Sequence, residues 1–158
     1  MAQERPSYTI LPNDLTSEAV TALLAFHLAE MHRWSPVCKV HAMPVERLRK
    51  PDVSFYSAWA NGELAAVGAL KELGEERGEI KSMRAAPAFR NKGAGEAMLL
   101  HLMGEAQGRC YRWLGLETGR PEPFQPAGNL YRKHGFRECA PFGEYVSDEF
   151  SLCMSREL

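Results

Sequence analysis

The chain has 158 residues, of which 45% are hydrophobic and 25% charged, and its net charge at pH 7 is −1. These values are typical of a soluble globular protein, and the length predicts a single domain over residues 1–158 with a buried core. The balanced charge argues against a nucleic-acid partner, and no apolar run approaches the roughly 20 residues of a membrane span. We therefore expect the protein to bind neither nucleic acid nor a membrane.

The start of the chain predicts a cytoplasmic protein. The segment MAQERPSYTI carries Glu4 and Arg5 and lacks the apolar centre of a secretion signal. The four cysteines form no C-x-x-C pair, so reduced thiols are expected rather than disulfides.

A short strand and a long helix are predicted next. Residues 8–11, YTIL, precede a proline and favour a strand, and Asp14 or Thr16 is expected to cap the helix that follows. Hydrophobic residues then recur at intervals of three and four, which predicts a helix with one buried face that ends near Trp34.

The histidines of this region are His27, His32 and His41, and their spacing matches no zinc signature. We therefore expect no metal, and histidines that belong to the core or the surface. His32 and Trp34, which leave the helix at its end, are candidates for substrate contact.

Three sequential antiparallel strands are expected in the middle of the chain. Residues 44–49 predict a short helix, and residues 55–60 and 63–70 predict two strands joined by Asn61-Gly62, the signal of a type I′ hairpin. A second turn then leads into a strand that begins at Glu79.

The remaining elements complete an α/β fold. A helix follows residue 95, and residues 111–118 predict a strand that pairs in parallel with the strand from Glu79, because a helix joins the two. Residues 126–134 predict a short helix, and residues 136–140 and 150–154 a closing antiparallel pair. The expected fold class is a mixed α/β sheet with helices on its faces.

The stretch RNKGAG, Arg90 to Gly95, lies between a strand and a helix. Unpaired N–H groups of a first helical turn converge at such a place, and the helix dipole adds positive potential. Gly93 and Gly95 leave room for a phosphate, and Arg90 and Lys92 supply charge. The glycine spacing fits neither a dinucleotide fingerprint nor a P-loop.

This R-x-x-G-x-G pattern resembles the acyl-CoA diphosphate loop of the GNAT superfamily of N-acetyltransferases. The segment LYRKHGF, Leu130 to Phe136, resembles a later motif of the same family, and the order of elements is similar over nearly the full chain. EIKSM, LETG and PFG resemble a bacterial subgroup that acts on small molecules. The resemblance implies a mostly antiparallel sheet whose central parallel strand pair is splayed to hold acyl-CoA.

The resemblance also implies acetyl-CoA as co-substrate. The main chain of Met83 and Ala85, beside a bulge in the central strand, is expected to bind pantetheine. The other expected cofactor contacts are Arg90, Asn91, Lys92, Gly93, Ala94, Gly95, Phe124, Ala127 and Asn129. Phe124 stands where many members have an asparagine that bonds pantetheine, so that contact is expected to be apolar or to come from Asn129.

Two catalytic residues are implied by the resemblance. Tyr131 is expected to act as general acid toward the CoA sulfur, and Glu79 as the general base that deprotonates the amine. Glu117 on the neighbouring strand is the rival base, or a group that binds a cationic substrate.

The sequence thus predicts an acetyl-CoA-dependent N-acetyltransferase that acetylates a primary amine of a small molecule. A protein or peptide N-acetyltransferase and a non-catalytic acyl-CoA sensor are the alternatives, and a homodimer is compatible with each.

Overall fold

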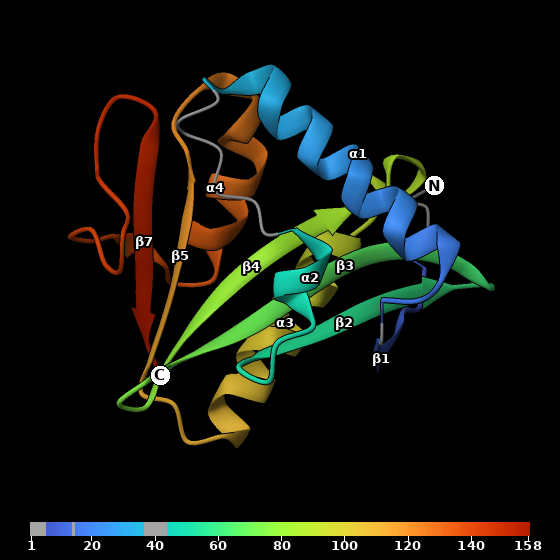
Figure 1. Cartoon of the computed structure of the whole chain (residues 1–158), viewed down its shortest axis with the longest axis horizontal. Helices are drawn as coiled ribbons and strands as arrows, with labels where there is room; N and C mark the ends of the chain where they lie inside the picture. Colours follow the sequence, from blue (N-terminus) through green and yellow to red (C-terminus); the bar gives the residue numbers. More distant parts are fainter. Residues whose placement is uncertain (1–5, 14, 37–43) are drawn as a thin grey trace.

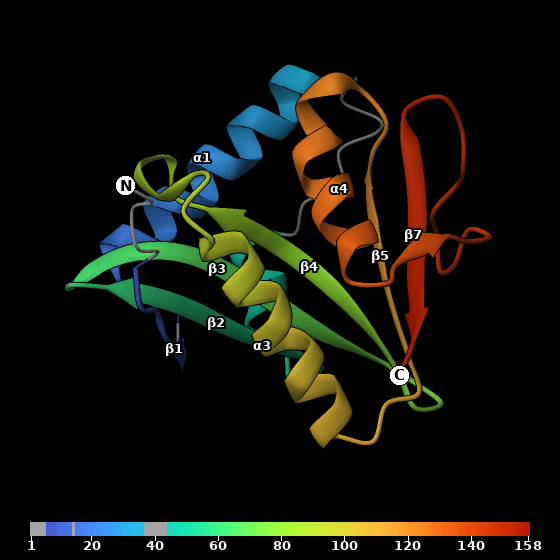
Figure 2. The ribbon, with the colours of Figure 1, turned by 180° about the vertical axis from the view of Figure 1, so that it is seen from behind.

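The computed structural model describes residues 6–13, 15–36 and 44–158, which form a mixed sheet with helices on both faces (Figures 1 and 2). The strand order is β1-β2-β3-β4-β5-β7-β6, and all neighbours are antiparallel except β4 and β5, which are parallel. The predicted fold class and its parallel pair are confirmed.

The strands are β1 (Thr9–Pro12), β2 (Val53–Ala60), β3 (Glu63–Gly74), β4 (Arg77–Ala85), β5 (Trp113–Gly119), β6 (Arg137–Glu138) and β7 (Ser151–Glu157). The helices are α1 (Glu18–Trp34), α2 (Val45–Leu48), α3 (Ala94–Gly108) and α4 (Gln125–Lys133), with short 3-10 turns η2 (Pro87–Phe89) and η3 (Glu122–Phe124). The predicted elements therefore form, with ends that differ by a few residues.

The cap of α1 differs from the prediction. The hydroxyl of Ser17 accepts a hydrogen bond from the main-chain N–H of Val20 at 3.1 Å. Thr16 was the wrong choice because Ser17 directly precedes the first helical residue, from where a side-chain oxygen reaches the third N–H. Asp14 lies outside the described residues.

Both predicted turns of the antiparallel meander form. Asn61 and Gly62 have φ of 51° and 78°, the left-handed pair that a type I′ hairpin requires. The turn between β3 and β4 places Glu75 and Glu76 at φ of 54° and 60°, so two non-glycine residues adopt the same region there.

Two hydrophobic layers hold the helices against the sheet. On one face Met98, Leu99 and Leu102 of α3 pack against the sheet, and on the other Leu23 of α1 and Leu48 of α2 do so. Figure 1 shows α1 and α2 in front of the sheet, and Figure 2 shows α3 and α4 from the opposite side.

The parallel strands β4 and β5 separate along their length. Their paired residues run only from Arg77–Trp113 to Glu79–Gly115, although both strands continue beyond this point. Figure 1 shows the two strands together near the C-terminus and apart at their far ends. This divergence opens the centre of the sheet.

A bulge in β4 accompanies the separation. The register with β3 passes from Val67–Arg84 to Ala69–Lys81, which leaves one extra residue in β4, and Ser82 has a φ of 52°. A bulge bends a strand and increases its twist, which carries the end of β4 away from β5. The bulge expected in the central strand is therefore present.

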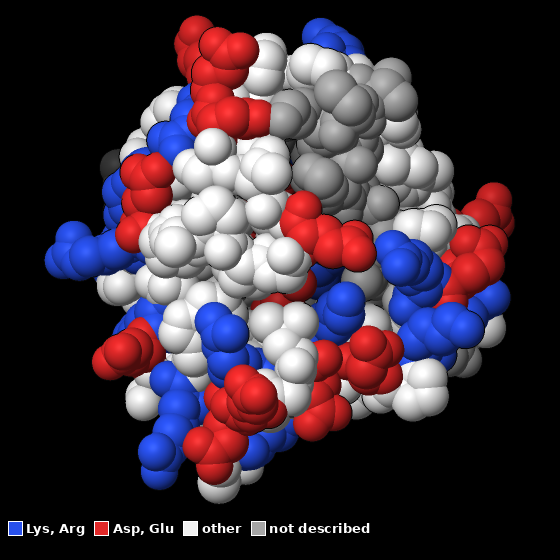
Figure 3. Space-filling view, turned by 60° about the vertical axis from the view of Figure 1, so that its left-hand side comes forward, with Lys and Arg blue, Asp and Glu red and all other residues white. Residues whose placement is uncertain are grey.

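Charged side chains are mixed over the face drawn in Figure 3, where Lys and Arg alternate with Asp and Glu. In the described part of the chain, no helix is long and apolar enough to cross a membrane.

Candidate active site

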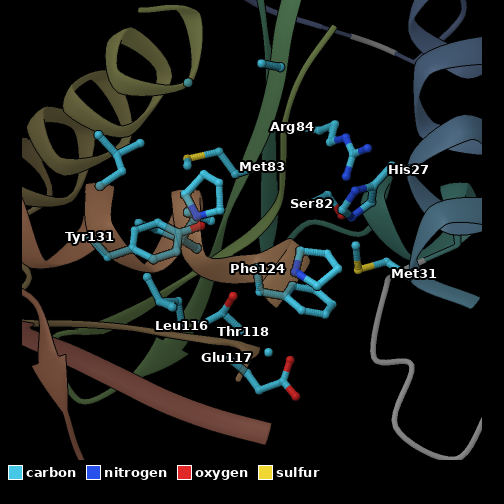
Figure 4. A pocket seen from close by; sticks show the side chains of 18 of the residues that line it. His27, Met31, Ser82, Met83, Arg84, Leu116, Glu117, Thr118, Phe124 and Tyr131 are labelled. Atoms are coloured by element: carbon cyan, nitrogen blue, oxygen red, sulfur yellow. The ribbon is translucent and has the colours of Figure 1, made fainter. Parts of the chain in front are cut away.

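A cavity of about 730 Å³ occupies the gap between β4 and β5. Its walls come from α1, from both strands, from the first turn of α3, from α4 and from residues 145–151. Figure 4 shows side chains of α1, β4, β5 and α4 around one space.

One end of the cavity is the first turn of α3. Gly93 is the N-cap residue with a φ of 83°, and no side chain caps the helix. The N–H groups of this turn are therefore not used by a cap, and together with the helix dipole they form an anion site. A Cβ at Gly95 would lie 3.8 Å from a side-chain carbon of Leu130, an ordinary van der Waals contact, so a methyl group there would displace no neighbouring side chain.

The loop before α3 is fixed from two sides. The hydroxyl of Tyr8 donates to the carbonyl of Lys92 at 2.7 Å, and the guanidinium of Arg90 donates to Glu30 Oε1 of α1 at 2.8 Å. Glu30 is buried although it is acidic, and it also accepts a hydrogen bond from Arg84 of β4. Glu30 thus ties the loop to the bulged strand.

Tyr131 of α4 lies on the wall opposite α1. The side chain is 6% exposed, and its ring packs edge-on against Phe136 with 5.9 Å between ring centroids. Burial raises the pKa of Tyr131 to about 12, so the phenol keeps its proton at neutral pH. Figure 4 places Tyr131 near Met83 and Leu116, in the apolar part of the cavity.

Glu79 lies on the floor of the cavity and is 4% exposed. The hydroxyl of Tyr145 donates to Glu79 Oε2 at 2.5 Å, and Lys81 Nζ lies 3.4 Å from the same oxygen. Lys81 also donates to the Tyr145 oxygen at 2.5 Å. Oε2 of Glu79 therefore contacts both a hydroxyl donor and an ammonium group.

Glu117 of β5 faces the same region in a different environment. Burial raises its pKa to about 7, with further upward contributions from the charges of Glu79 and Asp148. Lys81 and a hydrogen bond from Ser151 act in the opposite direction. Among the carboxylates that line the cavity, Glu117 therefore takes up and releases a proton near neutral pH.

Basic and aromatic side chains from α1, β4 and η3 meet at the α1 side of the cavity. The Arg84 guanidinium carbon lies 5.3 Å from the Trp34 ring centre, and the Trp34 ring meets Phe124 edge-on with 5.5 Å between centroids. Burial and the charge of Arg84 lower the pKa of His27 to about 4, so this imidazole is neutral at pH 7.

The structure brings most of the predicted site residues to this cavity. Those that line it are Trp34, Glu79, Met83, Ala85, Arg90, Asn91, Gly93, Ala94, Gly95, Glu117, Phe124, Ala127 and Tyr131. His32, Lys92 and Asn129 are exposed and do not line it. Phe124 lines the cavity with an aromatic ring, which is the apolar one of the two alternatives expected at that position. The ligand roles of all these residues stay predictions.

Sequence reasoning missed Lys81, Ser82, Arg84 and Tyr145, and assigned His27 only to the core or the surface. Each of the five lines the cavity. The signal for Ser82 and Arg84 was their place just before the glycine loop, but which face they occupy depends on the bulge. Tyr145 had no local signal, because pairing of β5 with β7 brings its loop to the site.

Among the described residues, no group of three or more His, Cys, Asp or Glu side chains could hold a metal ion. His41 and Cys38 lie outside the described residues.

Comparison with known proteins gives concordant results. Residues 20–136 match the model of the Acetyltransferase (GNAT) family. The chain is 43% identical to the N-acetyltransferase YedL of Escherichia coli (strain K12), over 96% of this chain and 99% of that protein. It is 44% identical to the N-acetyltransferase YsnE of Bacillus subtilis (strain 168), over 92% and 97% of the two chains.

Solved structures share the fold. A Klebsiella pneumoniae protein assigned as an acyl-CoA N-acyltransferase superposes with a TM-score of 0.76 at 27% identity, over 96% of this chain and 97% of that one. A Bacillus subtilis acetyltransferase in complex with CoA superposes with a TM-score of 0.67 at 20% identity, over 96% and 99% of the two chains.

Proposed function

The chain belongs to the GNAT family of acetyltransferases, and we propose that it transfers the acetyl group of acetyl-CoA to the primary amine of a small molecule. The observation that carries this proposal is the extent of one cavity. It reaches from the first turn of α3 to Tyr131 and to two carboxylates, so an anionic donor, an amine and the groups that move protons fit along one path.

The donor would be held mainly by the main chain. The first turn of α3 would bind its diphosphate, and Gly95 places no side chain beside the N–H groups of this turn. Beyond Glu79, β4 no longer has β5 as a partner, so Met83 and Ala85 lie at an open strand edge. Pantetheine amides can bond there as an added strand would.

The acceptor amine needs a base. An alkylammonium with a pKa of about 10 is almost wholly protonated at pH 7. Glu117, with a pKa of about 7, is matched to this task, because a base works best when its pKa lies near the working pH. Oε2 of Glu79 is already contacted by the Tyr145 hydroxyl and by Lys81, which leaves this oxygen less accessible to a substrate amine. We therefore assign proton removal to Glu117, with Glu79 as the alternative.

Tyr131 would act on the leaving group. The amine nitrogen bonds to the carbonyl carbon, and the bond from that carbon to the CoA sulfur breaks. In becoming an amide the ammonium loses two protons, one to Glu117 and then to solvent, and one that ends on the sulfur by way of the Tyr131 hydroxyl. A phenol with a pKa of about 12 is protonated and ready to donate.

The test is an acceptor panel. The protein is mixed with acetyl-CoA and single small amines, and released thiol and acetylated amine are measured together. We expect equal amounts of both for at least one amine. A protein that acetyl-CoA stabilises but that acetylates no amine would be a sensor. Acetylation of peptides alone would point to a protein N-acetyltransferase.

A further inference from the structure

The bulge in β4 decides which side chains face α1. Before it, Ile80 belongs to the core under α3, so Glu79 and Lys81 point to the other face of the sheet. After it, Met83 and Ala85 pack against the α3 core. The extra residue shifts the alternation of side chains between the two faces of the sheet by one position, so Arg84 lies on the same face as Lys81. From there the Arg84 side chain reaches Glu30 of α1.

This shared face is acidic at one end and basic at the other. Glu117 lies at the acidic end. At the basic end Glu30 accepts from both Arg84 and Arg90, so one carboxylate faces two guanidinium groups and a positive charge is left over. A guanidinium has five N–H groups, and among the described residues Arg84 uses them for one hydrogen bond, to Glu30.

Two further polar groups beside Arg84 have no partner. Ser82 Oγ and His27 Nδ1 are buried atoms without a hydrogen bond in the described part of the chain, and both residues line the cavity. Buried polar atoms in proteins are nearly always hydrogen-bonded. A hydroxyl, an imidazole N–H and a guanidinium can all donate, so together they suit one ligand group with several acceptor oxygens.

The two ends are separated by apolar side chains. Figure 4 shows His27, Ser82 and Arg84 gathered on one side of the pocket and Glu117 on another, with Met31 and Phe124 between them. A ligand that reaches both ends must place a hydrophobic segment against these two side chains.

We propose that the acceptor is an aminocarboxylic acid whose amine and carboxylate are separated by an apolar segment. Arg84, Ser82 and His27 bind the carboxylate, and the amine lies at Glu117. This assignment rests on the proposed acetylation of a small amine, and it adds the second charged group of the substrate.

Matched acceptors test the assignment. 4-(Aminomethyl)benzoate and benzylamine differ only in the carboxylate, and 6-aminohexanoate and pentylamine form an aliphatic pair. For the wild-type protein we expect kcat/KM to be at least about 10-fold higher for the carboxylate-bearing member, as one charge-assisted contact provides. Glycine is expected to be poor, because its two charged groups cannot reach both ends.

Variants show which residues carry the preference. Ser82→Ala and His27→Leu remove an unpartnered group, so each is expected to leave the free protein as stable as before or more stable, yet to lower the ratio of kcat/KM between the matched acceptors several-fold. Arg84→Gln should abolish the ratio. Arg33→Gln, at an exposed position of α1, is the control and should keep it.

The outcomes separate the two proposals. Equal kcat/KM for both members of each pair would overturn the aminocarboxylate assignment while acetylation of small amines stood. A ratio that the three variants leave unchanged would also overturn it. If no amine were acetylated at all, the proposed function would fail, and thermal stabilisation of the protein by CoA with benzoate, but not with benzylamine, would still locate the carboxylate site.

Discussion

Replacing Glu117 with glutamine is expected to stabilise the protein at high pH. The carboxyl has a pKa of about 7 in the folded chain against an ordinary value of 4.5, so the folded state binds more protons than the unfolded state between these values. The free energy of unfolding therefore falls as pH rises through this window. The destabilisation by the buried charged carboxylate is fully present above pH 7 and absent below pH 4.5. The difference corresponds to about 3 kcal/mol. Glutamine carries no charge at any pH, so the variant does not undergo this destabilisation.

Urea unfolding at pH 5 and pH 8 measures the effect. Glu117→Gln is expected to raise the free energy of unfolding by up to about 3 kcal/mol at pH 8 and by much less at pH 5, with an unchanged dependence on urea. Glu149→Gln, at an exposed position before β7, is the matched control. If both variants respond equally to pH, the Glu117 carboxyl is not held in the environment that makes it a neutral-pH base.

Three more changes probe the rest of the site. Gly95→Ala should leave the free energy of unfolding unchanged or raise it by up to about 1 kcal/mol, because Ala favours a helix and its methyl group meets Leu130 no closer than 3.8 Å. Calorimetry should show that the variant binds acetyl-CoA about 10-fold or more weakly than the wild type. Equal binding would mean that the diphosphate does not bind at this turn. Tyr131→Phe should lower kcat by about 10-fold or more at nearly constant KM for acetyl-CoA, and wild-type turnover would leave the ring with a packing role alone. Tyr145→Phe removes a donor to buried Glu79 and should cost about 1–3 kcal/mol in urea unfolding; no loss would mean that this hydrogen bond is dispensable.

Local patterns predicted the parts of the site that depend on local structure. The glycine spacing of Gly93 and Gly95 identified the first turn of α3, because a helix start after a strand is coded by neighbouring residues. The Asn61-Gly62 turn was predicted from its dipeptide, and the parallel pairing of β5 with β4 from the helix that joins these two strands. Tyr131 came from a family motif rather than from periodicity.

The acceptor side of the cavity could not be predicted in this way. The face that Arg84 occupies depends on one extra residue at Ser82, and the resemblance implied a bulge in this strand but not the residue at which it falls. Glu30 reads as a solvent-facing residue of a helix, yet it is buried between two arginines that are distant in the chain. The pKa of Glu117 is raised by burial between strands that meet only in the folded sheet.

The dependence of acetyl transfer on pH tests the central claim most directly. Acetylated amine is quantified for the wild-type protein and for Glu117→Gln between pH 5.5 and 9.5, with acetyl-CoA and an acceptor both near saturation. The wild-type rate should rise with a midpoint near 7 and then level off, as a base with the pKa of Glu117 requires. The variant should be slower by about 10²–10⁴-fold at pH 7 and keep rising toward the pKa of the amine. The same profile for both proteins would contradict the role of Glu117, and the absence of acetylated amine at every pH would contradict the proposed transfer itself.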